Sequence, residues 1–165
     1  MARPRRLPAF PYVGCQRYFL TICTHQRVPR FTSDDEVTLV HEQILKTSLA
    51  EEFELTAYCY MPDHWHALVT GLTESADLRR FADGVKQRGG WHFSRARQQR
   101  LWQHGYYERV LRDDETTPAV IEYIVNNPVR AKLVNGPLDY LYWGSSRYSR
   151  QELLEFIGRT ERWRP

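Results

Sequence analysis

The feature that most constrains this chain is a pair of histidines, His64 and His66, on either side of Trp65 in a short apolar run. In a β-strand, residues two apart point to the same face, so both imidazoles project from one side and the indole from the other. Two imidazoles on one rigid face form half of a metal site. The pattern fits equally well two half-buried strand histidines that hydrogen-bond to their neighbours.

The segments around this pair alternate between β-forming and amphipathic runs, which is typical of an α+β chain. We expect strands over 17–24, 53–61, 64–70 and 101–111, and helices that begin near Ser33, Ser75 and Thr117. This order predicts a ferredoxin-like βαββαβ antiparallel sheet with the first two helices on one face. The histidines then point to the opposite, open face, and the late helix lies near that face.

Two local signals bear on the helix boundaries. Ser33 and Glu36 have the spacing of a capping box, which predicts a helix start. Gly89 and Gly90 fall inside the second helix and predict a kink or a break, because glycine costs about 1 kcal/mol in a helix interior.

The segment 79–100 is strongly basic, whereas the whole chain carries a net charge of only +3. It holds seven basic residues and one acidic residue, Asp83, and aromatic residues are interleaved with the charges. Such a mixture suits single-stranded nucleic acid, although a solvated helix face is the alternative. We expect DNA contacts from this segment and from the N-terminus, at Arg79, Arg80, Lys86, Arg88, Arg95, Arg97 and Arg100, and at Arg3, Arg5 and Arg6.

The chain length of 165 residues fits one domain. We expect residues 1–16 to form a basic N-terminal arm and residues 17–134 to form the functional domain. We expect residues 135–165 to form a tail that packs at most against the outside of that domain or extends from it. The three cysteines lack CxxC spacing and fit a reducing cytosol. No apolar run reaches the roughly 18 residues of a membrane span, and the start lacks the apolar core of a signal peptide.

A second pair of candidate residues lies on the late helix. Tyr123 and Asn127 are four residues apart, so they lie on one side of a helix. A helix laid across the open sheet face brings both to the histidines, with Asn127 as a third metal ligand and Tyr123 presenting its phenol. The alternative is that Asn127 caps a helix end and Tyr123 is an amphipathic core residue. Asn127 also precedes Pro128, which disfavours helical geometry there.

The sequence resembles the IS200/IS605-type tyrosine transposases, and most closely the REP-associated tyrosine transposases. The resemblance covers about residues 16–148, and the order and spacing of its motifs together are specific. The matching stretches are Tyr18-Phe19-Leu20-Thr21, Met61-Pro62-Asp63-His64-Trp65-His66, Trp102-Gln103-His104-Gly105-Tyr106-Tyr107-Glu108, Tyr123-Ile124-Val125-Asn126-Asn127-Pro128-Val129-Arg130-Ala131 and Trp143-Gly144-Ser145-Ser146.

The resemblance implies a role for each candidate residue. His64 and His66 match a pair of metal-binding histidines separated by a bulky apolar residue, the HUH motif, here with Trp65 between them. Tyr123 matches the nucleophile, and Asn127 matches the ligand position where insertion-sequence relatives often carry Gln. The implied activity is cleavage and rejoining of single-stranded or hairpin DNA through a 5′-phosphotyrosine, with Mg²⁺ or Mn²⁺ as cofactor. A bacterial cytoplasmic protein, nucleoid-associated when bound to DNA, is expected, as a monomer rather than a homodimer.

Other functions remain open from the sequence. One is a metal-dependent nuclease without a covalent step, and another is a non-enzymatic protein that binds hairpin or single-stranded DNA. Tyr106 and Tyr107 are alternative nucleophiles, but neighbours on a strand face opposite sides, so only one of them can face the metal. The sequence leaves open the DNA target, the natural metal, whether the Tyr123 helix acts within its own chain, and whether mobilisation still occurs.

Overall fold

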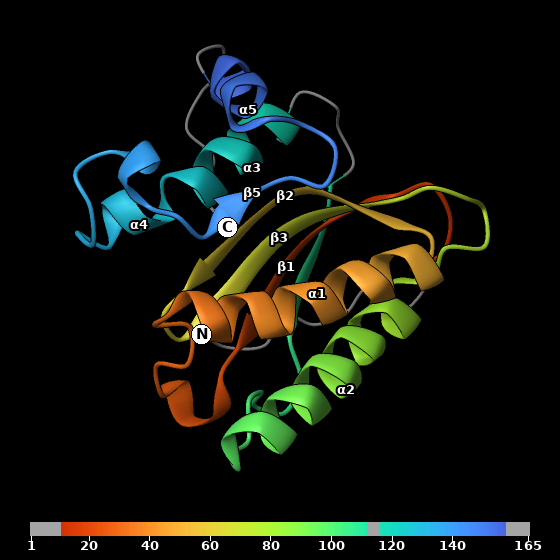
Figure 1. Ribbon diagram of the computed structural model, residues 1–165. Coiled ribbons are helices and arrows are strands. Elements are labelled where there is room, and N and C mark those ends of the chain that lie inside the picture. The colour runs from red at the N-terminus through yellow and green to blue at the C-terminus, as the bar shows by residue number, and fades with distance from the viewer. Residues whose placement is uncertain (1–10, 112–115, 158–165) are drawn as a thin grey trace.

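The computed structural model describes residues 11–111 and 116–157, and these residues build an antiparallel sheet between two layers of helices (Figure 1). The strand order is β4-β1-β3-β2-β5. The strands are β1 Arg17–Cys23, β2 Phe53–Met61, β3 His64–Gly71, β4 Tyr107–Leu111 and β5 Trp143–Gly144. The first four strands have the order of a ferredoxin-like sheet, so the predicted α+β fold is confirmed. Arg3, Arg5 and Arg6 lie outside the described residues.

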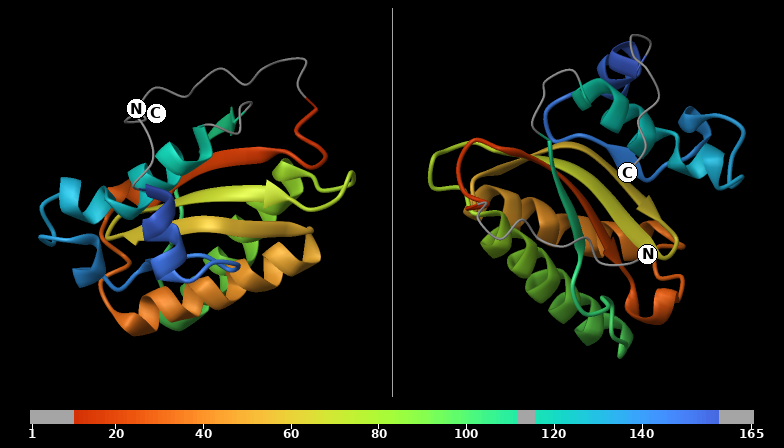
Figure 2. Two further views of the ribbon diagram at one scale, coloured as in Figure 1. Left: turned by 90° about the horizontal axis from the view of Figure 1, so that it is seen from above. Right: turned by 180° about the vertical axis from the view of Figure 1, so that it is seen from behind.

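Helices cover both faces of the sheet. The long helices α1 and α2 pack side by side on one face, and α3, α4 and α5 lie on the other (Figures 1 and 2). Short 3-10 turns occur at His25–Arg27 and Pro137–Asp139. The helices are α1 Asp34–Ala50, α2 Leu78–Arg97, α3 Thr116–Val125, α4 Asn127–Arg130 and α5 Arg150–Ile157.

The alternation of side chains along each strand divides the interior into two cores. On β1, Leu20 and Ile22 belong to the core under α1 and α2, whereas Phe19 belongs to the core under α3 and α5. On β3, Trp65 belongs to the first core and Leu68 to the second. The face that carries His64 and His66 is therefore the one that α3 approaches, as the period of two predicts.

The fourth strand is shorter than the predicted 101–111. Trp102 forms only an isolated bridge with Thr24, and regular pairing with β1 begins at Tyr107. Gly105, with φ of 77°, interrupts the run, because this backbone conformation is rarely adopted by residues with a Cβ. The expectation of a continuous strand from 101 was therefore wrong in its first half.

Helix α2 continues through Gly89 and Gly90 without a break, contrary to the prediction. Asp77 is the N-cap of this helix, and its carboxylate accepts hydrogen bonds from the backbone N–H groups of Arg79 and Arg80 at 2.7 and 3.3 Å. Packing of α2 against α1 and the sheet outweighs the local cost of two glycines, about 1 kcal/mol each.

The predicted capping box at the start of α1 forms differently. Ser33 is the N-cap, but its side chain makes no capping hydrogen bond to the helix backbone. Instead, the Glu36 carboxylate accepts from the Thr32 backbone N–H at 3.2 Å and from the Ser33 hydroxyl at 3.2 Å. The carboxylate alone therefore organises this helix start.

The C-terminal segment is part of the core rather than a covering of the outside. Trp143 is 1% exposed, and β5 pairs with β2 through Cys59↔Trp143 and Tyr58↔Gly144. Leu153 of α5 is fully buried beside α3. The expectation that the tail packs at best against the outside was wrong for Trp143 and Leu153. Within the part of the chain that the structure describes, no helix has both the length and the apolar character to cross a bilayer.

Candidate active site

The β2–β3 hairpin brings the two histidines together. Met61 pairs with His64 directly across the turn, so both imidazoles leave β3 at its first residues. The Nε2 atoms of His64 and His66 lie 3.0 Å apart, and their ring planes are nearly perpendicular. The two nitrogens thus converge on one point, as the alternation of a strand predicts.

The outer nitrogens of both rings have partners. His66 Nδ1 lies 2.8 Å from the Thr21 hydroxyl, and His64 Nδ1 lies 2.6 Å from an Asp63 carboxylate oxygen. The other oxygen of Asp63 bonds Arg27 Nε at 2.8 Å. A carboxylate accepts the proton of His64 Nδ1, which leaves the Nε2 lone pair free for a cation. These contacts fix the orientation of both rings.

Burial keeps both imidazoles neutral. Desolvation lowers the pKa of His66 well below its usual value, and the neighbouring His64, Arg27 and Arg130 lower this pKa further. Burial also lowers the pKa of His64, although the hydrogen bond to Asp63 opposes this shift. A neutral imidazole is the form that binds a metal ion, so the pair is ready to act as ligands near neutral pH.

These lowered pKa values predict that apo protein loses stability in mild acid. Below about pH 6.5 the unfolded chain binds protons at His64 and His66 that the folded chain does not, so the free energy of unfolding falls as the pH falls. Urea titrations in EDTA at pH 7.5 and 5.5 measure this loss of unfolding free energy. His66→Gln should lessen the loss by up to about 1.4 kcal/mol per pH unit. An identical loss in wild type and His66→Gln contradicts the assignment.

Tyr123, on α3, lies beside the histidine pair in the same chain. Its ring centroid is 5.7 Å from that of His66 and 5.7 Å from that of Phe19, both in edge-on geometry. The guanidinium of Arg130 lies over the Tyr123 ring, 4.2 Å from its centroid. The predicted approach of the late helix to the histidine face thus brings Tyr123 to His66.

Asn127 keeps its helical relation to Tyr123 although the helix is interrupted. Pro128 has no N–H, and α3 ends at Val125 before α4 begins at Asn127. The buried side-chain amide of Asn127 donates to the Tyr123 carbonyl oxygen at 3.0 Å. This bond uses the amide nitrogen and leaves the amide oxygen as the acceptor atom of the side chain. Among the described residues, no group of three or more His, Cys, Asp and Glu side chains is placed to hold a metal.

The two rival tyrosines pack into different cores, one on each side of the sheet, and Tyr106 lies just before β4 begins. Tyr107 packs edge-on against Phe19 with ring centroids 6.2 Å apart, on the histidine face, and Tyr106 packs against the core under α1 and α2. Thr21 pairs with both Tyr107 and His66, so β1 separates Tyr107 from the histidines. Tyr107 is therefore the rival that shares the histidine face, and it lies two strands away from His66, on the far side of β1.

The basic residues of 79–100 lie on α2 and in the turn after it, and α2 covers the sheet face opposite α3 (Figure 1). Arg79, Arg80, Arg88, Arg95, Arg97 and Arg100 are exposed, and Lys86 is half-buried. The backbone N–H of Gln103 donates to the Cys23 carbonyl at 3.0 Å, and Cys23 pairs with His64. The C-terminal end of α2 therefore leads to the end of the sheet where the histidines lie.

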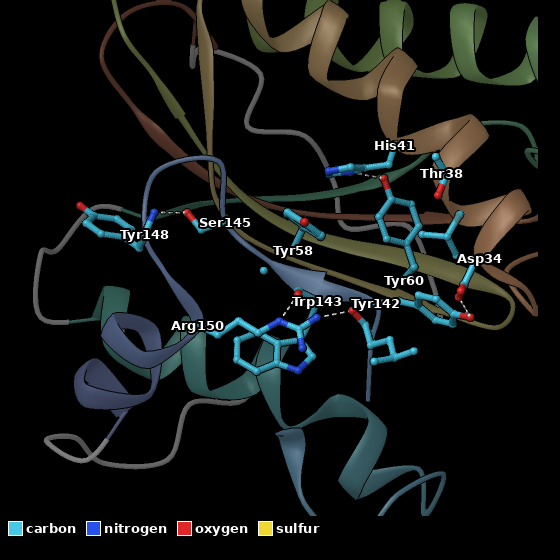
Figure 3. A pocket seen from close by; sticks show the side chains of 13 residues that line it. Asp34, Thr38, His41, Tyr58, Tyr60, Tyr142, Trp143, Ser145, Tyr148 and Arg150 are labelled. Atoms are coloured by element: carbon cyan, nitrogen blue, oxygen red, sulfur yellow. Dashed lines mark hydrogen bonds between the residues drawn. The ribbon is translucent and has the colours of Figure 1, made fainter. Parts of the chain in front are cut away.

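A hollow of about 490 Å³ lies between α1, β2 and the segment 141–150 (Figure 3). His41 and Tyr60 line it, joined by a 3.1 Å hydrogen bond, and Arg150 rests against Trp143. None of the residues predicted for the site lines this hollow. It is separate from the histidine pair.

Sequence reasoning missed three residues that contact the site: Thr21, Asp63 and Arg130. Each lies inside a stretch that carries the family resemblance, but the resemblance gave none of them a role. The alternation of β1 and its pairing with β3 place Thr21 opposite His66, and no local pattern reveals such a long-range pairing. Arg130 lies seven residues after Tyr123, two helical turns along, and that spacing was the available signal.

Comparison with known proteins agrees with this geometry. Residues 13–127 match the family described as Transposase IS200 like, which is well over half of the chain. The chain belongs to the IS200-like transposase family. Its members are DNA-cleaving and strand-transferring enzymes, and the matched region of this transposase includes both histidines, Tyr123 and Asn127.

Individual relatives point to the REP-associated tyrosine transposases. One such protein of Haemophilus influenzae is 27% identical over 155 residues, covering 82% of this transposase and 83% of the relative. The solved structure of a REP-associated tyrosine transposase bound to a REP hairpin superposes with a TM-score of 0.72 at 22% identity, covering 87% of this chain and 82% of that one. The solved structure of a Deinococcus radiodurans transposase superposes with a TM-score of 0.52 at 24% identity. This match covers 77% of this chain and 97% of that one. These structural matches establish the shared fold.

Proposed function

We propose that this transposase cleaves and rejoins single-stranded DNA at hairpin sequences through a 5′-phosphotyrosine on Tyr123, assisted by a divalent ion at His64, His66 and Asn127. The observation that carries the proposal is the convergence of two neutral imidazoles within 3.0 Å of each other, beside the ring of Tyr123 at 5.7 Å from His66. The REP hairpin bound to the solved relative supports the choice of DNA.

The donor set fits a divalent cation. With their Nδ1 atoms held by Asp63 and Thr21, His64 and His66 bring their Nε2 atoms to 3.0 Å from each other, so one cation could take both nitrogens as ligands. The Asn127 amide oxygen is a hard ligand that suits Mg²⁺ and Mn²⁺, and imidazole nitrogen suits Mn²⁺ better than Mg²⁺. When bound, the ion polarises the scissile phosphate and neutralises developing charge.

Tyr123 supplies the nucleophile. Its phenol oxygen attacks phosphorus and the bond from phosphorus to the 3′ oxygen breaks, so the products are a 5′-phosphotyrosine and a free 3′-OH. Attack by a 3′-OH on the phosphotyrosine reverses the step and joins strands, so the bond energy is kept and no ATP is required. The Arg130 guanidinium lies 4.2 Å from the centroid of the Tyr123 ring, and this cation–π contact holds the ring in position.

The same chain supplies both halves of the proposed site. Tyr123 contacts His66 of its own chain, so a complete site requires no second copy. This supports a monomer in which the nucleophile helix acts in cis. Sedimentation at the concentrations used for cleavage should therefore find an active monomer.

We predict that the C-terminal end of α2 contacts the DNA backbone. Neutralising the exposed Arg95, Arg97 and Arg100 together to Gln should lower the slope of log affinity against log salt by up to about three, because each phosphate contact releases counterions. Binding to a labelled hairpin at several salt concentrations measures the slope. Arg147→Gln, an exposed arginine on the tail, is the control, and an unchanged slope in the triple variant assigns this end of α2 to solvent.

A covalent-adduct assay tests the proposed function as a whole. Hairpin DNA with a single-stranded flank, incubated with the protein and Mn²⁺, should give a protein–DNA adduct that survives a denaturing gel, and EDTA should abolish it. Cleaved DNA without any adduct supports a hydrolytic nuclease instead. Retention of the hairpin without cleavage supports a binding protein.

A further inference from the structure

Arg130, the last residue of α4, lies beside the proposed nucleophile. The central carbon of its guanidinium is 4.2 Å from the centroid of the Tyr123 ring. Its positive charge also adds to burial and to the charges of His64 and Arg27 in lowering the pKa of His66. Arg130 is therefore within electrostatic range of both the nucleophile and the histidine pair.

The Arg130 guanidinium has its hydrogen-bond donors available. The side chain is exposed, and within residues 11–111 and 116–157 its guanidinium makes neither a hydrogen bond nor an ion pair. Arg27, by contrast, bonds Asp63 through Nε at 2.8 Å and donates from Nη1 to Cys23 Sγ at 2.8 Å. Arginine presents five N–H donors in a planar fork that matches two oxygens of a phosphate. Of the two arginines near His66, Arg130 is therefore the one with its whole fork available.

The charges around the histidine pair favour an anion. Burial keeps His64 and His66 neutral. The carboxylate of Asp63 is shared between His64 Nδ1 and Arg27 Nε. Arg27 and Arg130 together thus outweigh this carboxylate, and a surplus of positive charge attracts a phosphate.

The place of Arg130 over the ring suits the phosphate that Tyr123 attacks. The phenol oxygen lies at the edge of the ring, and the guanidinium N–H groups spread outward from a centre above the same ring. When this oxygen bonds to phosphorus and the bond to the 3′ oxygen breaks, negative charge is spread over the non-bridging oxygens. Donors that are already near these oxygens stabilise the charge without reorganising.

We propose that Arg130 is a catalytic residue that binds a non-bridging oxygen of the scissile phosphate and neutralises its charge while Tyr123 attacks. The guanidinium thus contacts the substrate in addition to holding the Tyr123 ring. The inference rests on the proposed function, because that function places the scissile phosphate at Tyr123.

The test removes the charge from each partner of this contact in turn. The adduct assay first locates the cleaved bond, and a second hairpin then carries a neutral methylphosphonate at that position. In EDTA, wild type should bind the phosphate hairpin about tenfold more tightly than the methylphosphonate hairpin, and Arg130→Gln should bind both alike. In Mn²⁺ with saturating phosphate hairpin, Arg130→Gln should form the adduct about 100-fold more slowly.

Lys132→Gln is the matched control. Lys132 is exposed and is the other basic residue in the segment 123–138, which has no acidic residue. Its loss should weaken both hairpins equally and leave adduct formation at saturating DNA unchanged. Arg130→Lys keeps the charge without the planar fork, so its discrimination and its rate should lie between those of wild type and Arg130→Gln.

A purely structural role for Arg130 gives a different result. If Arg130→Gln is slow but still prefers the phosphate hairpin tenfold, Arg130 only holds the ring and the proposal is overturned. Equal affinity of wild type for both hairpins overturns it as well, and so does adduct formation by Arg130→Gln at the wild-type rate. In each of these cases the wild-type adduct on Tyr123 leaves the proposed function standing. A wild-type protein that forms no adduct on Tyr123 overturns the proposed function and this inference together.

Discussion

His64→Ala and His66→Ala should each abolish cleavage of hairpin DNA in Mn²⁺ while leaving hairpin binding largely intact. Each substitution removes one of the two converging Nε2 atoms, and a single imidazole with one amide oxygen is too few ligands to hold the ion. Binding survives because contacts to the phosphate backbone supply most of the affinity. Cleavage rates and hairpin affinity, measured on the same preparations, separate the two effects.

A graded variant sharpens this prediction. Thr21→Val keeps the shape of the side chain but removes the hydroxyl that holds His66 Nδ1, so metal affinity should fall by about 10- to 100-fold and extra Mn²⁺ should restore cleavage. His41→Ala, on α1 at the opposite face of the sheet, is the matched control and should cleave normally. Full cleavage by both His64→Ala and His66→Ala refutes the assignment of the metal site.

Tyr123→Phe should remove cleavage and the protein–DNA adduct together, by at least about 10⁴-fold. The substitution deletes only the attacking oxygen, so the edge-on contacts of the ring with His66 and Phe19 and the stacking of Arg130 remain. Fold, metal binding and hairpin binding should therefore be unchanged. Single-turnover cleavage and a denaturing gel of the adduct measure the loss.

Tyr107→Phe is the matched control, because Tyr107 is the rival nucleophile that lies on the histidine face. It should cleave and form the adduct as wild type does. If the protein instead activates a water molecule, Tyr123→Phe keeps most of its cleavage and wild type forms no adduct. If Tyr107 is the nucleophile, the two variants exchange their phenotypes.

Local patterns predicted the elements that position the site. The period of two placed His64 and His66 on one face, because it follows from backbone geometry within a single strand. The spacing of four brought the Asn127 amide to the Tyr123 carbonyl oxygen, although Asn127 lies beyond the end of α3. The strand order followed from the sequence of elements in the same way.

Long-range pairing escaped prediction. Thr21 holds His66 only because β1 and β3 pair in a particular register, and Trp143 is buried because its short strand joins the edge of β2. The continuity of α2 through Gly89 and Gly90 was also set by tertiary packing, which outweighs the local helix propensity. Each of these features depends on residues far apart in the sequence.

Mapping the covalent adduct of the wild-type protein tests the central claim most directly. Trypsin separates the candidates, because cleavage after Arg112 and Arg130 gives a peptide with Tyr123 as its one tyrosine, and cleavage after Arg100 and Arg109 gives a peptide with Tyr106 and Tyr107. After the protein is incubated with hairpin DNA and Mn²⁺, mass spectrometry should find the nucleotide on Tyr123. A nucleotide on the other peptide, or cleaved DNA with neither peptide modified, contradicts the proposed mechanism.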